Sequence, residues 1–144
     1  MLIYRKMKYH FNYILSLFIA AIILYLTLFY KPSEDNELAK IEYMDKIVHA
    51  LMFFGFAWAV AFDYTRQQIN KRHSDLSMCI RVFVLSIVYG GVIELLQGEF
   101  FPERYADWKD FLSDALGALI GLSVYLLFFK KYTIRYFSSI RKQK

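Results

Sequence analysis

The sequence is poor in cysteine and, over long stretches, in charge. Its single cysteine, Cys79, cannot form an internal disulfide or a thiolate zinc site, so we expect it to be a small apolar filler. Three stretches almost lack charge: residues 11–30 contain none, residues 82–96 contain only Glu94, and residues 111–129 contain only Asp114. Each approaches the about 20 apolar residues that a membrane-spanning helix needs, which excludes an ordinary soluble domain.

Apolar residues dominate the rest of the chain. Of the 144 residues, 58% are hydrophobic, the mean hydropathy is +0.30, and a fourth apolar stretch, residues 47–62, carries only His49. Because the connections are short, consecutive helices are expected to be antiparallel neighbours. We predict an all-α integral membrane antiparallel four-helix bundle, a single domain of residues 1–144. Its helices are expected at approximately residues 11–30, 45–64, 80–98 and 110–130, followed by a basic cytoplasmic tail at 131–144.

Lysine and arginine are distributed unevenly along this predicted bundle. Thirteen of the eighteen lie in the N-terminal segment, the second loop and the tail, and five lie in the other two loops. Because cytoplasmic segments carry the excess of basic residues, both termini are predicted to be cytoplasmic, in a multi-pass protein of the cell membrane. The net charge of +5 therefore reflects topology, and no nucleic-acid partner is expected. The first helix is expected to be retained, because its apolar run exceeds the about 7–15 residues of a signal peptide.

Three ionisable residues, His49, Glu94 and Asp114, lie inside the predicted spans. A carboxylate in such a span costs about 2.5–3.5 kcal/mol on insertion scales, so it is rarely kept without a role. Measured from the charged residue at the inner end of each helix, with about 1.5 Å of rise per residue, the three lie roughly 20–24 Å along their helices. In hydrocarbon about 30 Å thick, they share one layer near the outer surface. The sequence therefore predicts that the three residues meet.

Residues at helical spacing extend this polar layer toward the outer surface. Asp45 lies one turn from His49 and Gln97 lies one turn from Glu94, so each pair shares a helix face. The complete set of candidate ligand-binding residues is Asp45, His49, Glu94, Gln97, Arg104, Asp107, Asp110 and Asp114. The alternative interpretation is a structural network, in which these side chains satisfy one another and only lock the four helices together.

The last predicted span carries acidic residues and glycines on one face. Asp110, Asp114, Gly117 and Gly121 recur at intervals of three or four residues. A Gly-x-x-x-Gly pair lets another backbone approach closely, so Gly117 and Gly121 are predicted helix-packing residues. This close approach would hold Asp114 against a neighbouring helix.

The order and spacing of these residues resemble the VanZ-like family of small bacterial membrane proteins, whose founding member is associated with resistance to the glycopeptide teicoplanin. The resemblance covers roughly residues 44–122 and is carried by Asp45-Lys46-x-x-His49, Glu94-x-x-Gln97, Arg104-x-x-Asp107, Asp110 and Asp114-x-x-Gly117-x-x-x-Gly121. One departure is Glu103, where a small residue is usual. The resemblance implies a location in the bacterial cell envelope and a role linked to antibiotic resistance. It supplies no reaction.

Three functional interpretations remain open. In the first, the site binds a lipid-linked or glycopeptide-like molecule at the outer leaflet, and Arg104 contacts an anionic headgroup. In the second, the protein is an intramembrane hydrolase or transferase acting on a lipid headgroup. Its catalytic candidates are His49, Glu94 and Asp114, and His49, Glu94, Asp110 and Asp114 are candidates for binding a divalent metal ion. In the third, the protein carries protons, which is least favoured because the inner half of the spans offers almost nothing polar.

Overall fold

The computed structural model describes residues 13–29, 41, 43–68, 74–100 and 107–142, with side chains as far as residue 140. Within these residues every regular element is a helix, as the composition predicts. The elements are α2 (Ile14–Leu28), α3 (Met44–Gln67), α4 (Asp75–Phe100), α5 (Trp108–Val124), the π-helix η3 (Tyr125–Phe129) and α6 (Lys130–Lys142). The main difference from the prediction is that the last span and the tail form one helical segment, which passes through η3 without a loop.

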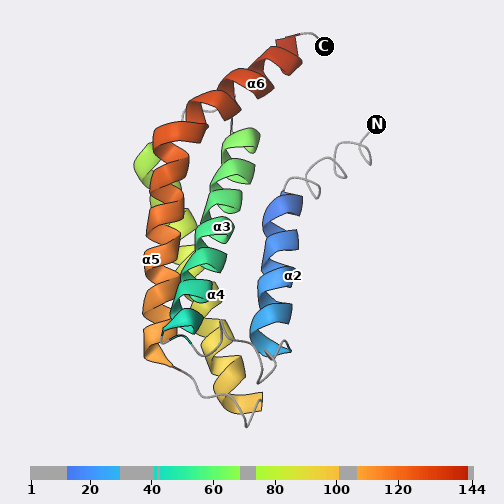
Figure 1. Ribbon diagram of the computed structural model, residues 1–144. Coiled ribbons are helices and arrows are strands. Elements are labelled where there is room, and N and C mark those ends of the chain that lie inside the picture. Colours follow the sequence, from blue (N-terminus) through green and yellow to red (C-terminus); the bar gives the residue numbers. More distant parts are fainter. Residues whose placement is uncertain (1–12, 30–40, 42, 69–73, 101–106, 143–144) are drawn as a thin grey trace, which may run out of the picture.

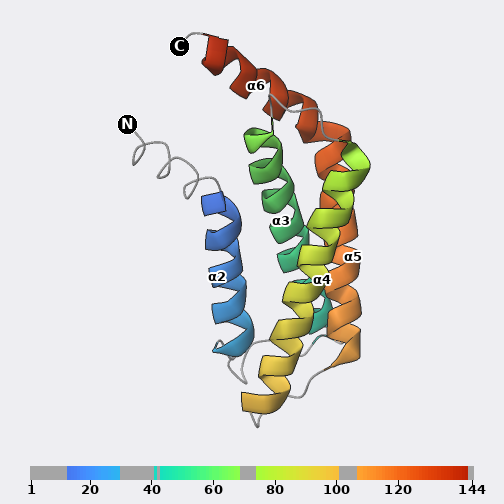
Figure 2. The ribbon, with the colours of Figure 1, turned by 180° about the vertical axis from the view of Figure 1, so that it is seen from behind.

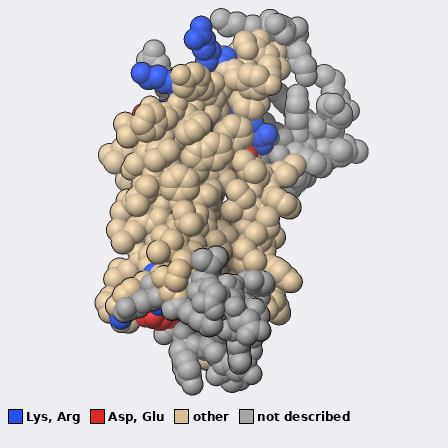
Figure 3. Space-filling view, viewed as in Figure 1, with Lys and Arg blue, Asp and Glu red and all other residues tan. Residues whose placement is uncertain are grey.

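Three of these helical segments are long and apolar enough to cross a membrane, namely Met44–Gln67, Asp75–Phe100 and Trp108–Ile140. The described part of α2 has 15 residues, fewer than the about 20 that a perpendicular span requires. On the face seen in Figure 3, the charged side chains gather toward the two ends and the middle is free of them. This distribution matches a bundle that presents an apolar belt to lipid.

Helix α3 occupies the middle of the molecule, with α2 on one side and α5 on the other (Figures 1 and 2). It contacts every other helix that the structure describes. Its Phe53, Phe56, Ala57 and Val60 are almost fully buried. The core around them comes from Ile23 of α2, Val82 and Ile93 of α4, Ala118 and Leu122 of α5, and Tyr125 of η3. Apolar packing of α3 against the other helices therefore fixes the positions of the polar residues that it carries, while one side with Ile47, Val48 and Leu51 stays exposed.

A buried polar cluster lies at the C-terminal end of α3. Asp63 is 0% exposed, and its Oδ2 accepts hydrogen bonds from the Ser16 backbone N–H at 2.9 Å and from the Ser16 hydroxyl at 2.7 Å. Thr65 and Thr133 are buried in the same part of the bundle. The prediction that this half of the spans offers almost nothing polar is therefore wrong. Asp63 is the charged residue at the inner end of the second predicted helix, and packing of α2 against α3 encloses it.

Aromatic rings connect α3 to the segment that follows α5. Trp58 packs edge-on against Tyr125 and Phe129, with ring centroids 5.8 and 5.5 Å apart. One turn farther along α3, Phe62 meets Phe137 of α6 at 6.0 Å. The π-helix thus carries the aromatic contact surface from α5 onto α6, which leans away from the bundle axis in Figure 1.

Candidate binding site

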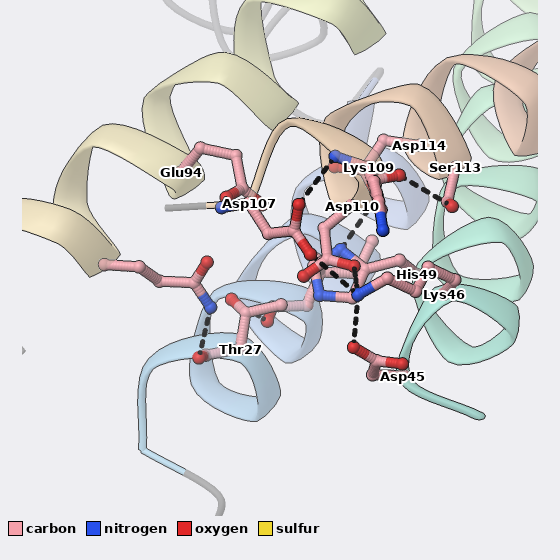
Figure 4. A network of polar contacts seen from close by, with 12 residues as sticks. Thr27, Asp45, Lys46, His49, Glu94, Asp107, Lys109, Asp110, Ser113 and Asp114 are labelled. Atoms are coloured by element: carbon pink, nitrogen blue, oxygen red, sulfur yellow. Dashed lines mark hydrogen bonds and ion pairs between the residues drawn. The ribbon is translucent and has the colours of Figure 1, made fainter. Parts of the chain in front are cut away.

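Three helices bring the three predicted ionisable residues together at one end of the bundle (Figure 4). His49 lies in the second turn of α3, Asp114 in the second turn of α5, and Glu94 near the C-terminal end of α4. One potential ligand atom from each side chain lies within 4.8 Å of the others, and all three residues are buried. We call these residues the triad.

Two glycines on α5 determine how closely it approaches α3. A Cβ atom at Gly117 would lie 2.8 Å from Ala50 Cα, and one at Gly121 would lie 2.9 Å from Phe54 Cα. Each would also overlap the backbone carbonyl of the same α3 residue. Because backbone rather than a flexible side chain occupies that space, only glycine fits at either position. Asp114 lies one turn before Gly117, so the same approach brings its carboxylate to His49.

A hydrogen bond joins two members of the triad directly, since His49 Nδ1 lies 3.0 Å from Asp114 Oδ1. An ionised carboxylate can only accept, so in this contact the neutral imidazole carries its proton on Nδ1 and keeps a lone pair on Nε2. The other carboxylate oxygen, Asp114 Oδ2, has no hydrogen-bond partner in the structure. It lies beside Gly90 of α4, where an added Cβ would be 2.9 Å away. Gly90 therefore leaves room for this carboxylate.

The third member, Glu94, is fixed through one oxygen only. Its Oε2 accepts the backbone N–H of Asp107 at 2.9 Å, just before α5 begins. Its Oε1 is buried and, like Asp114 Oδ2, has no hydrogen-bond partner within the described part of the chain. A buried acceptor without a partner costs roughly 1–3 kcal/mol, so two of them within one cluster need an explanation.

Beside the triad, Lys46 forms ion pairs with three carboxylates, and we call these four residues the Lys46 layer. Its Nζ lies 2.5 Å from Asp45 Oδ2, 2.8 Å from Asp107 Oδ2 and 3.0 Å from Asp110 Oδ1. Lys46 is not among the residues predicted for the site, because it lies among the loop charges that indicate topology. Its position one turn before His49 is a signal for it in the sequence.

Asp107 joins this charged layer to the start of α5. It is the N-cap residue of α5, and its Oδ1 accepts the backbone N–H of Lys109 at 2.9 Å. The hydrogen bond from Lys46, and then that from the Lys109 backbone, hold the pKa of Asp107 below its usual value. The carboxylate is therefore ionised at neutral pH, as the ion pair with Lys46 requires.

The remaining predicted residues have separate surroundings. Gln97 donates from its Nε2 to the carbonyl oxygen of Thr27 at 2.9 Å, so it ties α4 to the last turn of α2. Arg104 lies outside the described residues.

The site carries more negative than positive charge among the described residues. Its five carboxylates belong to Asp45, Glu94, Asp107, Asp110 and Asp114, and Lys46 is the cation paired with three of them. Inside an apolar bundle, unbalanced charge is costly and marks a functional region. Chemically, the triad offers one imidazole and two carboxylates, a set suited to binding a cation or to moving a proton.

Apolar spans with a buried polar cluster at one end define an α-helical membrane protein. A comparison with protein-family models identifies the family: the model described as VanZ/LLP1 matches residues 3–129, and the chain belongs to this family. This confirms the resemblance found in the sequence. Comparisons with curated proteins and with solved structures yield no match.

Proposed function

We propose that this protein is a VanZ-like component of the bacterial cell envelope that binds a lipid-linked or glycopeptide-like molecule at the triad and the Lys46 layer. In this proposal the four helices alternate in direction through the cytoplasmic membrane, both termini are cytoplasmic, and the site opens to the outer leaflet. A role in antibiotic resistance follows from the family resemblance. The observation that carries the proposal is the pair of buried, unpartnered oxygens, Glu94 Oε1 and Asp114 Oδ2.

These two oxygens favour a binding site over a purely structural network. A network that only locks helices is expected to satisfy its own buried donors and acceptors, because each unpaired group lowers stability. Here Glu94 and Asp114 each use one oxygen in hydrogen bonding and leave the other without a partner. A bound molecule that donates hydrogen bonds to these two oxygens would satisfy both carboxylates.

Different parts of the site would bind different parts of such a molecule. Lys46, and Arg104 by its position in the sequence, would contact an anionic headgroup. The triad would accept hydrogen bonds from hydroxyl or ammonium groups. The aromatic residues near this end, among them the exposed Phe100 and Trp108, are suited to contact acyl chains or aromatic rings.

Native mass spectrometry of the full chain purified in mild detergent tests this proposal. The wild type should retain a lipid or lipid-linked adduct, and Glu94→Ala and Arg104→Ala should lose it. Ser123→Ala is the matched control, because the Ser123 hydroxyl donates only within α5, to the Leu119 carbonyl oxygen. If the wild type carries no adduct and the Glu94 variant differs only in thermal stability, the structural network is the correct interpretation.

Cysteine accessibility tests the proposed orientation. In a Cys79→Ser background, Lys109→Cys should react with an impermeant maleimide on intact cells. Lys131→Cys should react only after lysis. Both positions are exposed in the structure. Labelling of Lys109→Cys only after lysis would place the site on the cytoplasmic side.

The second candidate function is an intramembrane hydrolase or transferase acting on a lipid headgroup. It is favoured by the His49–Asp114 hydrogen bond beside Glu94, an arrangement that can serve acid/base chemistry. Incubation of the purified protein with a labelled bacterial lipid extract should then give a new lipid species, and His49→Ala should abolish it. Unchanged lipids alongside a retained adduct would leave binding as the function.

A further inference from the structure

We propose that His49, Glu94 and Asp114 bind a divalent first-row metal ion, with Zn²⁺ as the best fit. The inference deepens the proposed function and rests on it, because the same triad lines the proposed binding site. One imidazole nitrogen and two carboxylate oxygens are typical donors for such ions, whereas Ca²⁺ and Mg²⁺ prefer oxygen alone. The three donor atoms already lie within 4.8 Å of one another in a buried position.

Charge balance supports a dication. The triad contains two carboxylates and one imidazole, and the nearby cation Lys46 is engaged by Asp45, Asp107 and Asp110. With both triad carboxylates ionised, their charge is matched by one dication bound to a neutral imidazole. The neutral cluster that results is far less costly in an apolar bundle than two unbalanced carboxylates.

The two unpartnered oxygens are the observation that points to a ligand at this position. Glu94 Oε1 and Asp114 Oδ2 are buried and have no hydrogen-bond partner among the residues that the structure describes, so each has lone pairs available. Glu94 Oε2 accepts the Asp107 N–H, and this contact would orient the carboxylate as an outer-shell interaction does for a metal ligand. An ion bound between His49 Nδ1 and Asp114 Oδ1, which lie 3.0 Å apart, would replace the hydrogen bond between these two atoms, with the imidazole proton on Nε2.

To bind one ion, the three ligand atoms of the triad have to move slightly closer together. Ligand atoms around a tetrahedral Zn²⁺ are about 3.3 Å apart when the bonds are about 2.0–2.1 Å long. The triad atoms lie within 4.8 Å, so side-chain rotations on three fixed helices can close the difference. Three protein ligands leave a further coordination position open, as in catalytic zinc sites.

An open position on a cation explains how an acidic site could bind an anionic headgroup. The described carboxylates outnumber the described cation that contacts them, so they would repel a phosphate-bearing molecule on their own. A metal ion held by the triad would supply the positive charge at the centre of the site. The ligand class this favours is a phosphate-bearing lipid headgroup that completes the coordination of the ion.

Metal content of the purified full chain tests the inference. After dialysis against Zn²⁺ or Mn²⁺ and removal of free ion, the wild type should retain roughly one ion per chain. The near-isosteric variants Glu94→Gln and Asp114→Asn should fall to background. Asp75→Asn is the matched control, because Asp75 lies in the first turn of α4, at the other end of the bundle from the triad, and pairs with Lys130. Wild-type protein without stoichiometric metal, or unchanged metal in both triad variants, would overturn the proposal.

A second measurement keeps the test valid if a variant does not fold. An ion that binds the folded state raises the melting temperature, so Zn²⁺ should raise that of the wild type in a concentration-dependent way. The absence of any such shift counts against the site. Native mass spectra separate the two proposals, because metal and lipid adducts differ in mass. Lipid without metal would overturn only the metal site, and metal without lipid would overturn only headgroup binding.

Discussion

Two fully buried aspartates, Asp63 and Asp114, occupy opposite ends of the same bundle and have very different surroundings. Asp63 accepts two hydrogen bonds through Oδ2, and its Oδ1 lies 3.5 Å from Arg66 Nη2. Asp114 makes one hydrogen bond, to His49, and shares its buried space with a second carboxylate, that of Glu94. The two residues are equally hidden from solvent, and each keeps one oxygen without a hydrogen-bond partner among the described residues, but Asp63 lies near the cation of Arg66 whereas Asp114 lies beside a second carboxylate.

The partner of Asp63 shows what its carboxylate does. Ser16 is the third residue of α2, and its backbone N–H is one of the donors that a helix start leaves without an intrahelical partner. The N-cap residue Tyr13 provides no side-chain cap, so Asp63 of α3 satisfies this donor from a neighbouring helix. A negative charge there also interacts favourably with the helix dipole. The comparison teaches that burial alone does not mark a functional carboxylate. An unused acceptor does not mark one either, because Asp63 Oδ1 also lacks a hydrogen-bond partner among the described residues; the second carboxylate beside Asp114 is what distinguishes the triad.

The packing that creates the Asp114 site can be broken most strongly at Gly117. Gly117→Ala places a methyl group against the backbone of Ala50, so α5 must move away from α3 and the unfolding free energy should fall by about 3 kcal/mol. Thermal unfolding in detergent measures this. Gly55→Ala is the matched control, because nothing lies within 4 Å of the added Cβ there. It should be neutral or stabilising by about 0.5–1 kcal/mol. Equal effects of the two substitutions would contradict the close approach.

Removal of the balanced aspartate should have the next largest effect. Asp63→Ala leaves the Ser16 N–H and hydroxyl without their acceptor, and the unfolding free energy should fall by about 2 kcal/mol. Asp63→Asn keeps an acceptor oxygen and should recover part of the loss. Ligand and metal binding at the triad should be unchanged in both variants. Loss of binding in Asp63→Asn without loss of stability would give Asp63 a functional role and remove the contrast.

Substitutions in the triad should not lower stability as Asp63→Ala does. Asp114→Asn and Glu94→Gln remove charge from an unbalanced cluster, so without ligand their stability should be unchanged or higher by about 1 kcal/mol. Adduct and metal binding should be lost. Chemical denaturation and native mass spectrometry on the same samples measure both. A stability loss as large as that of Asp63→Ala would show that the triad serves mainly to hold the helices together.

The smallest effect should come from substitution in the Lys46 layer. The partners of Asp107 lower its pKa, so its ion pair with Lys46 should persist above the ordinary aspartate pKa and be lost only as pH falls through the lowered folded-state value. Wild type should therefore melt at a slightly higher temperature than Lys46→Met at neutral pH. The gap should shrink below about pH 4. A gap that widens on acidification would contradict this assignment.

Much of this arrangement could be predicted from the sequence, because apolar length and helical rise are local properties. The uncharged stretches predict the helices, and the equal distances of His49, Glu94 and Asp114 from their helix ends predict one layer. The glycine spacing predicts a close approach, and the structure identifies α3 as the partner.

The contacts that the sequence does not predict are those that depend on which helices pack against each other. Asp63 looks like a boundary charge until α2 is packed over it, because nothing local to Asp63 indicates Ser16, which is 47 residues away. The amide of Gln97 similarly meets the end of α2 rather than the triad. The sequence does not indicate that Lys46 belongs to the site, because a lysine beside a membrane span is usually a topology signal. Its three carboxylate partners come from two separate segments of the chain.

The π-helical segment Tyr125–Phe129 also determines the rotational phase of everything that follows it. A π-helical turn contains more residues than an α-helical one, and each residue of an α-helix advances the direction of its side chain by about 100°. If the same five residues were wound as an α-helix, with no change in length, α6 would rotate by roughly that angle. Phe137 would then turn away from Phe62, and another side of α6 would meet α3. The winding of these five residues therefore decides which surface α6 presents to α3, without a change in any residue of α6.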